Sequence, residues 1–468
     1  MFDSGIAGSF QAPVILLRDV ASEVGLSPDD RRIEKFSRNQ ERRDILSSGL
    51  LKTEEAIPLI ALFQEHYGRW VSFDTATRPE MLLHQLRSSP LLLAACCLIA
   101  IRHTNMELAG RLADPLFQEV KSLLTGTILS VPQSVEFFQA SVVLSFWSTT
   151  IGQSPLSLDS WLLSGFALQH GFASAVFSLS AEGTIGGRPK SKGELDRLCI
   201  WNHLCLSHLH YCVGTRRTAV LQRSHVDRCR WILDSDHATN FECRIIAEIY
   251  LYWTIYEHCY SYPVDLPKIQ AALRAWKLDW EYLFEQPRTQ FLQMGLHFAH
   301  LVAYDHSLKS RSAAVRESLL SEMVRLSVHI ISMAMETADD RTRHLSDHIY
   351  HMITFAAVTI CRLLHMYESQ LTASNDLAEL DKTVLTLATW LHSIGPPCHV
   401  AHTFGDVVAA FHKKLRPSAQ PTSPTLSYQE ADPVIDVDFA SLFPDLFGTN
   451  LLGGTTPELL PDWDPNFG

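Results

Sequence analysis

The chain has 468 residues, of which 46% are hydrophobic and 19% are charged, so it contains enough apolar material for a large globular core. Its formal net charge of -12 excludes a protein that binds nucleic-acid phosphates over its whole surface. The negative charge is distributed unevenly along the chain. From Ser418 onward there are eight acidic residues and no Lys or Arg, and subtracting those eight charges from -12 leaves -4 for the first 417 residues.

The first 44 residues form a mixed segment that we expect to be partly disordered. They begin with MFDSGIAGSF, which contains an acid and no apolar run and therefore does not resemble a secretory signal. The run RRIEKFSRNQERR at 31–43 predicts either a nuclear-import signal or an arm that contacts phosphates. Its interleaved glutamates fit a solvated amphipathic helix equally well. The basic residues of the run are Arg31, Arg32, Lys35, Arg38, Arg42 and Arg43.

From about residue 45 to residue 415, apolar residues recur at spacings of three and four, which predicts amphipathic helices. Strand patterns are nearly absent, so the sequence predicts an all-α, multi-helix domain of ten or more helices. The apolar run PLLLAACCLIAI at 90–101 is too short to span a bilayer and predicts a buried helix, and we expect no membrane contact. The expected helices lie near 53–68, 89–103, 132–149, 157–177, 192–213, 240–260, 287–308, 313–337, 341–368 and 376–394.

The end of the chain has a different composition. Residues 416–435 are rich in Pro, Ser and Thr, which favours a disordered linker. The following DVDFASLFPDLFG, at 436–448, alternates acids with bulky apolar residues, and LLPDWDPNF at 459–467 has the same character. This composition is typical of an acidic transcriptional activation segment at 436–468 that folds when it binds a coactivator groove. The alternative is a tail that docks on the protein's own helices. The expected contact residues are Phe439, Leu442, Phe443, Leu446, Phe447 and Trp463.

The stretch CIWNHLCLSHLHYC at 199–212 is the densest set of metal-ligand residue types. On a helix only the pairs Cys199/His203 and His208/Cys212 are spaced to chelate one ion, and each pair would need ligands from elsewhere. A regular apolar stripe runs along the same segment, so we expect a packed helix and no metal site.

The stretch HLSDHIYH aligns His344, His348 and His351 on one predicted helix but lacks the glutamate of an HExxH site. We expect these histidines to be solvated or to lie at the rim of the core. No acid/base pair, nucleophile elbow or phosphate-binding loop is apparent, so the sequence predicts no catalytic site, no enzyme activity and no cofactor.

Four stretches in chain order stand out as motifs. They are SGLLKTEEAIPLIALFQEHYGRWVSFD (48–74), SSPLLLAACCLIAIRH (88–103), DSWLLSGFALQHG (159–171) and LDRLCIWNHLCLSHLHYCVGTRR (195–217). Together they resemble the middle homology region of fungal binuclear zinc-cluster (Zn2Cys6) transcription factors, most of all activators of secreted proteases. The likeness covers about 45–260 and continues more diffusely to 415. It implies an all-helical regulatory domain with Trp161, Trp201 and Gly214 at motif positions, although Thr215 stands where a proline usually follows that glycine.

Members of that family read DNA through six cysteines in two closely spaced triplets that hold two zinc ions. Here the first cysteine is Cys96 and no CxxC occurs, so DNA contact by such a module is not assigned to this chain. Two alternatives stay open: the gene model begins downstream of the module, or the protein acts through a DNA-bound partner.

The resemblance implies a nuclear activator of genes for nutrient use or secondary metabolism. Its expected partners are transcriptional coactivators, and the resemblance is also compatible with a homodimer. The rival interpretations are a co-regulator without its own DNA contact and a helical protein that binds a small molecule between its helices.

Overall fold

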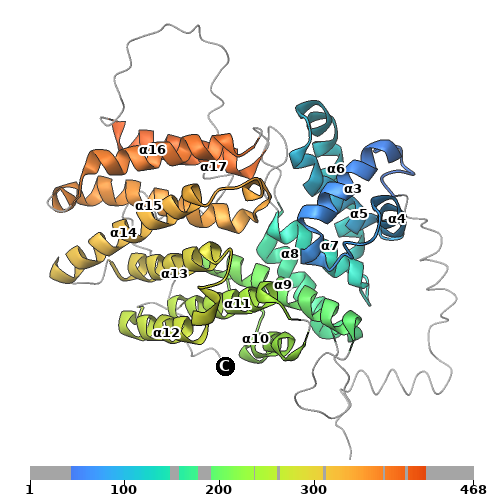
Figure 1. Ribbon diagram of the computed structural model, residues 1–468, viewed down its shortest axis with the longest axis horizontal. Helices are drawn as coiled ribbons and strands as arrows, with labels where there is room; N and C mark the ends of the chain where they lie inside the picture. Colours follow the sequence, from blue (N-terminus) through green and yellow to red (C-terminus); the bar gives the residue numbers. More distant parts are fainter. Residues whose placement is uncertain are drawn as a thin grey trace, which may run out of the picture. The chain divides into compact units, whose positions relative to one another are not determined.

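The computed structural model describes residues 44–147, 158–177, 191–236, 238–260, 264–308, 313–372, 375–395 and 399–417. The chain divides into the units Met1–Asp44 and Ile45–Gly468, and every described helix lies in the second unit. These residues form fifteen α-helices and six short 3-10 helices, with no strand among the described residues (Figure 1). The predicted all-α class is therefore confirmed. Our expectations for residues 1–43 and 418–468 lie outside the described residues.

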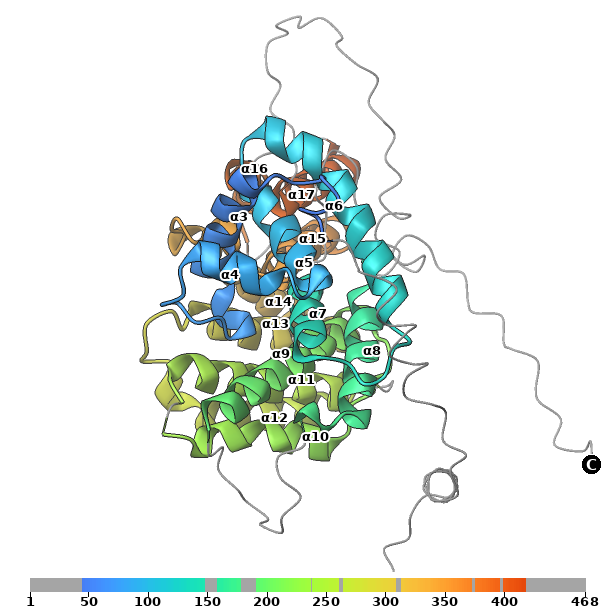
Figure 2. The ribbon, with the colours of Figure 1, turned by 90° about the vertical axis from the view of Figure 1, so that its right-hand side faces the viewer.

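The first group of helices packs around α5 (Pro90–Ala100), in which every residue from Leu91 onward is buried. The apolar run at 90–101 is thus a core helix, as predicted, and Pro90 begins it at a position where no backbone N–H is needed. Figure 2 faces this group. The helices that contact α5 are α3 (Thr53–His66), α4 (Pro79–Leu86), α6 (Met106–Thr127) and α7 (Val135–Phe146).

The centre of the fold is α9 (Lys192–Thr215), which contacts α7, α8 (Ser160–Ala173) and α11 (Asn240–Cys259). Both α9 and α11 begin with capping boxes, Ser191 with Glu194 and Thr239 with Glu242, so their first N–H groups are satisfied by side chains. The remaining elements around them are α10 (Arg223–Cys229), α12 (Leu266–Asp279) and α13 (Gln290–Leu308).

Successive helices in the last part of the chain pack side by side, from α13 through α14 (Ala313–Glu336) and α15 (Asp347–Leu371) to α16 (Leu377–Ser393) and α17 (Val400–Leu415) (Figure 1). Two segments, Val315–Glu336 and Asp347–Leu371, are long and apolar enough to cross a membrane by length and composition. Both pack against neighbouring helices in this array, and 72% of the apolar window in α15 is buried. Burial of this kind is what core helices show.

Ten predicted helices match observed ones, with one marked shift. The predicted helix 341–368 begins only at Asp347, because Thr342–His344 forms a 3-10 turn and Leu345 is extended. The other five α-helices, α4, α6, α10, α12 and α17, lie outside the predicted ranges.

Candidate functional site

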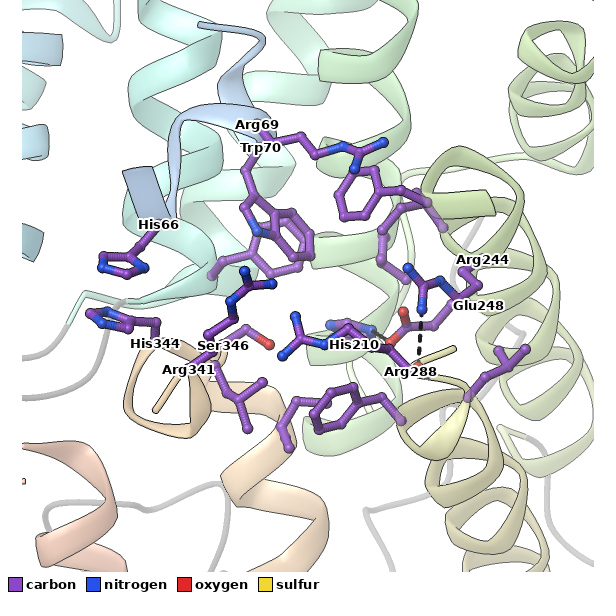
Figure 3. A pocket seen from close by; sticks show the side chains of 18 of the residues that line it. His66, Arg69, Trp70, His210, Arg244, Glu248, Arg288, Arg341, His344 and Ser346 are labelled. Atoms are coloured by element: carbon purple, nitrogen blue, oxygen red, sulfur yellow. Dashed lines mark hydrogen bonds and ion pairs between the residues drawn. The ribbon is translucent and has the colours of Figure 1, made fainter. Parts of the chain in front are cut away.

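A pocket of about 440 Å³ opens between the first and last groups of helices (Figure 3). Its walls come from the end of α3, η1 (Gly68–Val71), α9, α11, the start of α13 and the segment that leads into α15. Much of the lining is apolar: Trp70, Phe146, Leu206, Phe241, Ile245, Phe291, Leu292, Leu345 and Ile349. A pocket of this size with an apolar lining and a few polar groups is the usual form of a small-molecule site.

Two of the four arginines that line the pocket are paired with acids. Arg69 lies 3.2 Å from Glu242, and its guanidinium stacks over the ring of Phe241 with the centroid at 4.1 Å. Arg288 pairs with Asp339 at 2.8 Å. The backbone of Arg288 is left-handed, with φ at +65°, and this conformation sets the direction in which its side chain leaves the chain.

The other two arginines form no ion pair among the described residues. Arg244 donates to the carbonyls of Pro287 and Arg288, at 3.0 Å each, and to the Asn240 carbonyl at 3.2 Å. Burial, followed by the positive charges of Arg69 and Arg288, lowers the pKa of Arg244. The Arg341 guanidinium makes no hydrogen bond to the described residues, and Figure 3 shows it directed toward the middle of the pocket.

The acidic side of the pocket is Glu248, which lies 3.1 Å from Nε2 of His210. The imidazole of His210 stacks on that of His348, with ring centroids 3.6 Å apart and planes 11° apart. Nε2 of His348 is hydrogen-bonded to the hydroxyl of Tyr252. Burial, together with the neighbouring histidines His210 and His351, holds the pKa of His348 well below its usual range, so this imidazole is neutral.

His66 and His344, which line the pocket, belong to a polar junction between the end of α3, η2 (Ile101–His103) and the start of α15. The Tyr67 hydroxyl lies 2.5 Å from Nε2 of His103 and 2.9 Å from Nδ1 of His344. His344 also stacks on His66, with ring centroids 3.7 Å apart. Beside them Arg102 pairs with Asp347 at 3.4 Å, and both side chains are buried.

Two groups of side chains in the described part of the chain could hold a metal ion. The first is His210, Glu248 and His348 at the pocket, where the parallel stacking of two imidazoles and the bond to Tyr252 favour a hydrogen-bonded stack. The second is His392, His402 and Asp406 on α16 and α17, where Nε2 of His392 lies 2.9 Å from the Asp406 carboxylate.

The two chelating pairs considered from sequence have other partners in the structure. Nδ1 of His203 donates to the carbonyl of Trp70 at 2.9 Å. Nε2 of His208 accepts from the N–H of Val220 at 3.1 Å, so its Nδ1 carries the proton and lies 3.0 Å from the Ser164 hydroxyl. No third ligand joins either pair among the described residues. These histidines bind backbone and hydroxyl groups within a packed helix.

The expected alignment of three histidines at 344–351 is wrong. His344 lies in the 3-10 turn before α15, so it does not share a helix face with His348 and His351. His344 and His348 are also buried, at 7% and 6% exposure, and are not solvated.

The family-motif residues Trp161 and Trp201 lie on α8 and α9, which pack together. Trp161 donates its Nε1–H to the carbonyl of Thr218 at 3.1 Å and lies under the guanidinium of Arg217. Trp201 is 1% exposed and contacts Phe172 and Phe177.

Gly214, the third motif residue, lies within α9, and a Cβ atom there would meet nothing within 4 Å. The left-handed residue that ends the helix is Arg216, with φ at +54°. The turn geometry therefore does not depend on Gly214 or on a proline after it.

The pocket arginines were missed by sequence reasoning. The four are far apart in the chain, so no spacing marks them as a set. Arg69 lies on η1, Arg244 on α11, Arg288 before α13 and Arg341 before η6. The predicted contact residues of the activation segment, Phe439, Leu442, Phe443, Leu446, Phe447 and Trp463, lie outside the described residues. The basic residues at 31–43 lie outside them as well.

Comparison with known proteins places the described helices in one family. The family model of the middle domain of the transcriptional activator of proteases prtT matches residues 49–415, the whole helical body, whereas the sequence resemblance was clear only to about 260. An uncharacterized transcriptional regulatory protein of Schizosaccharomyces pombe is 30% identical over 394 residues, which are 80% of this chain and 71% of that protein.

Two transcriptional activators of proteases prtT are also similar. The one from Aspergillus clavatus is 25% identical over 420 residues, 88% of this chain and 62% of the relative. The one from Penicillium rubens is 29% identical over 326 residues, 68% of this chain and 48% of the relative. The chain thus spans about half to seven tenths of the length of these relatives. No solved structure matches it.

Proposed function

This chain belongs to the family defined by the middle domain of the transcriptional activators of proteases, and from that premise we propose that it regulates transcription. The observation that carries the proposal is the family match over 49–415, which coincides with the helical body from α3 to α17. The family consists of transcriptional regulators, so the helical body acts by binding and not by catalysis, and its place of action is the nucleus.

In this proposal the helical body is the regulatory part and residues 436–468 are the activating part. The acids of that segment keep its aromatic side chains in water, and the aromatic side chains anchor it in a coactivator groove when it binds. DNA is reached either through a zinc-cluster module outside this sequence or through a DNA-bound partner. The basic run at 31–43 serves as the nuclear-import signal.

The activating part is tested by fusing residues 418–468 to an unrelated DNA-binding domain and measuring a reporter gene. We expect the fusion to switch the reporter on, and we expect Phe443→Ala with Phe447→Ala to remove most of the activity. Tyr428→Ala, which removes an aromatic from the linker, is the matched control and should leave activity unchanged. A silent fusion would overturn the activation proposal and favour a co-regulator.

The import signal is tested by the distribution of a fluorescent fusion of the full chain. Replacing Arg31, Arg32, Arg42 and Arg43 with Gln should shift the fusion from the nucleus to the cytoplasm. An unchanged nuclear signal would assign import to another segment or to a bound partner.

A further inference from the structure

We propose that the pocket between η1, α11 and the start of α15 binds a small organic acid: a carboxylate that carries an aromatic or branched apolar group. Binding of this ligand can be measured on the purified protein. The proposal therefore does not rest on the proposed transcriptional function, and its outcome does not test that function.

The carboxylate is placed by Arg341, which forms no ion pair among the described residues, and by Arg288, whose partner is Asp339. Arg341 reaches toward the middle of the pocket with all its side-chain N–H groups free of described partners, and Arg288 extends toward the same space (Figure 3). A guanidinium presents a planar fork of donors that matches a carboxylate in two parallel hydrogen bonds. Arg244 adds a third positive charge, and all its hydrogen-bond acceptors among the described residues are backbone carbonyls.

The acids near the pocket have partners of their own. Glu242 is bound by Arg69 and by the Thr239 N–H at 2.8 Å, and Asp339 is bound by Arg288. Glu248 is hydrogen-bonded to His210, and Glu65 lies 3.9 Å from Nε2 of His66 with 75% of its side chain exposed. Arg244 lies close enough to Glu242 and Glu248 to feel their negative charges, although it forms no ion pair among the described residues. Arg341 is therefore the positive charge left without an acid, and an anion with one charge complements it.

The apolar part of the ligand is specified by the other side of the pocket. Phe241, Phe291 and Trp70 offer ring faces and edges, and Ile245, Leu292 and Ile349 offer aliphatic surface. An inorganic phosphate or sulfate would satisfy the arginines but would leave this surface in water. A ligand with an apolar group gains roughly 25 cal/mol for each Å² of apolar surface that it covers. The pocket therefore favours an organic acid over a bare anion.

The experiment measures binding to the purified full-length chain by calorimetry with 4-phenylbutanoate and 3-methylbutanoate as probes. Two further ligands separate the parts of the proposal: 4-phenylbutanamide, which lacks the charge, and inorganic phosphate, which lacks the apolar group. We expect the carboxylates to bind at least tenfold more tightly than the amide or phosphate, because hydrogen bonds to a charged group contribute about that much.

The decisive variant is Arg341→Gln. Arg341 is exposed, and its described hydrogen bonds are made by its backbone, which the substitution keeps, so the fold should survive. It should weaken carboxylate binding about tenfold or more and leave the amide unaffected. Arg274→Gln, the same change on the exposed face of α12, is the control and should bind like the original protein. Phe291→Ala should weaken 4-phenylbutanoate but not phosphate.

Three results would overturn the proposal. Carboxylates that do not bind at millimolar concentration, or that bind Arg341→Gln equally well, would show that the pocket is not their site. Phosphate binding as tight as that of 4-phenylbutanoate would identify a simple anion site. Each outcome leaves the reporter assay of the activating part unaffected.

Discussion

Glycine residues in this fold have unequal packing roles. Gly405 lies where α17 crosses α16, and a Cβ atom there would lie 2.6 Å from Cδ2 of His392 and 3.1 Å from the backbone oxygen of Ala388. Only a residue without a side chain allows this approach. At Gly214 in α9, by contrast, an added Cβ atom would have no neighbour within 4 Å.

We therefore predict opposite effects for the same substitution at these two positions. Gly405→Ala should lower the free energy of unfolding by about 1–3 kcal/mol, because α16 and α17 must separate and His392 must leave Asp406. Gly214→Ala should raise stability by up to about 1 kcal/mol, because alanine is the better helix former. Thermal and urea unfolding of both variants measure the effects. Equal destabilisation of the two would contradict this account of the α16–α17 contact.

At the scale of elements, the start of α15 is held by groups from distant parts of the chain. Asp347, the first residue of the helix, pairs with Arg102 of η2, and the Nε1–H of Trp147 donates to the carbonyl of Leu345 at 3.0 Å. These contacts fix the segment that carries Arg341 and His344 into the pocket wall. The position of the pocket depends on this junction.

Breaking the buried pair should therefore be costly. Arg102→Met leaves the Asp347 carboxylate buried without its cation, and we expect a loss of about 3–5 kcal/mol. The double replacement Arg102→Met with Asp347→Leu should recover a large part of that loss, because no uncompensated charge remains. A double-mutant cycle in urea measures the recovery. Additive losses would show that the two residues stabilise the fold through other neighbours.

The sequence predicts the long helices with a regular apolar pattern well. It predicts less well the segments whose conformation depends on packing against distant residues. The apolar run of α5, the capping residues of α9 and α11, and the stripes of α13 to α16 all have local signals. The 3-10 turn before α15 has none, because it follows from the contacts of Tyr67 and Tyr350 with the 342–344 segment. The pocket was also unpredictable, since its arginines come together only when η1, α11, the segment before α13 and the α14–α15 connection meet.

At the scale of the whole molecule, buried histidines with lowered pKa values recur across the described helices. Desolvation is the largest cause that lowers the pKa of His203, His208, His351 and His399, to about 4 in each case. They lie on α9, on α15 and at the start of α17, so protonation would affect contacts throughout the helical body. Their neutral form is the form that the fold stabilises.

This feature predicts a loss of stability in mild acid. Above pH 6.5 a histidine is neutral in both the folded and the unfolded chain, so it adds no pH dependence. As the pH falls from 6.5 toward 4, the unfolded chain takes up protons and the folded chain does not, so stability falls. Each such histidine then costs about 1.4 kcal/mol per pH unit. Below about pH 4 the folded form is protonated as well, and the loss reaches its limit.

Urea unfolding at pH 7.5 and pH 5.5 tests this prediction, and the unfolding midpoint should be clearly lower at pH 5.5. His208→Gln should reduce the difference between the two pH values by about 1.4 kcal/mol, although it lowers stability at both because the bonds to Ser164 and Val220 weaken. His84→Gln, which changes an exposed histidine of α4, should leave the difference as it is. Equal midpoints at both pH values would show that the buried histidines have the same pKa in the folded and unfolded chain. That result would contradict the effect of desolvation on these side chains.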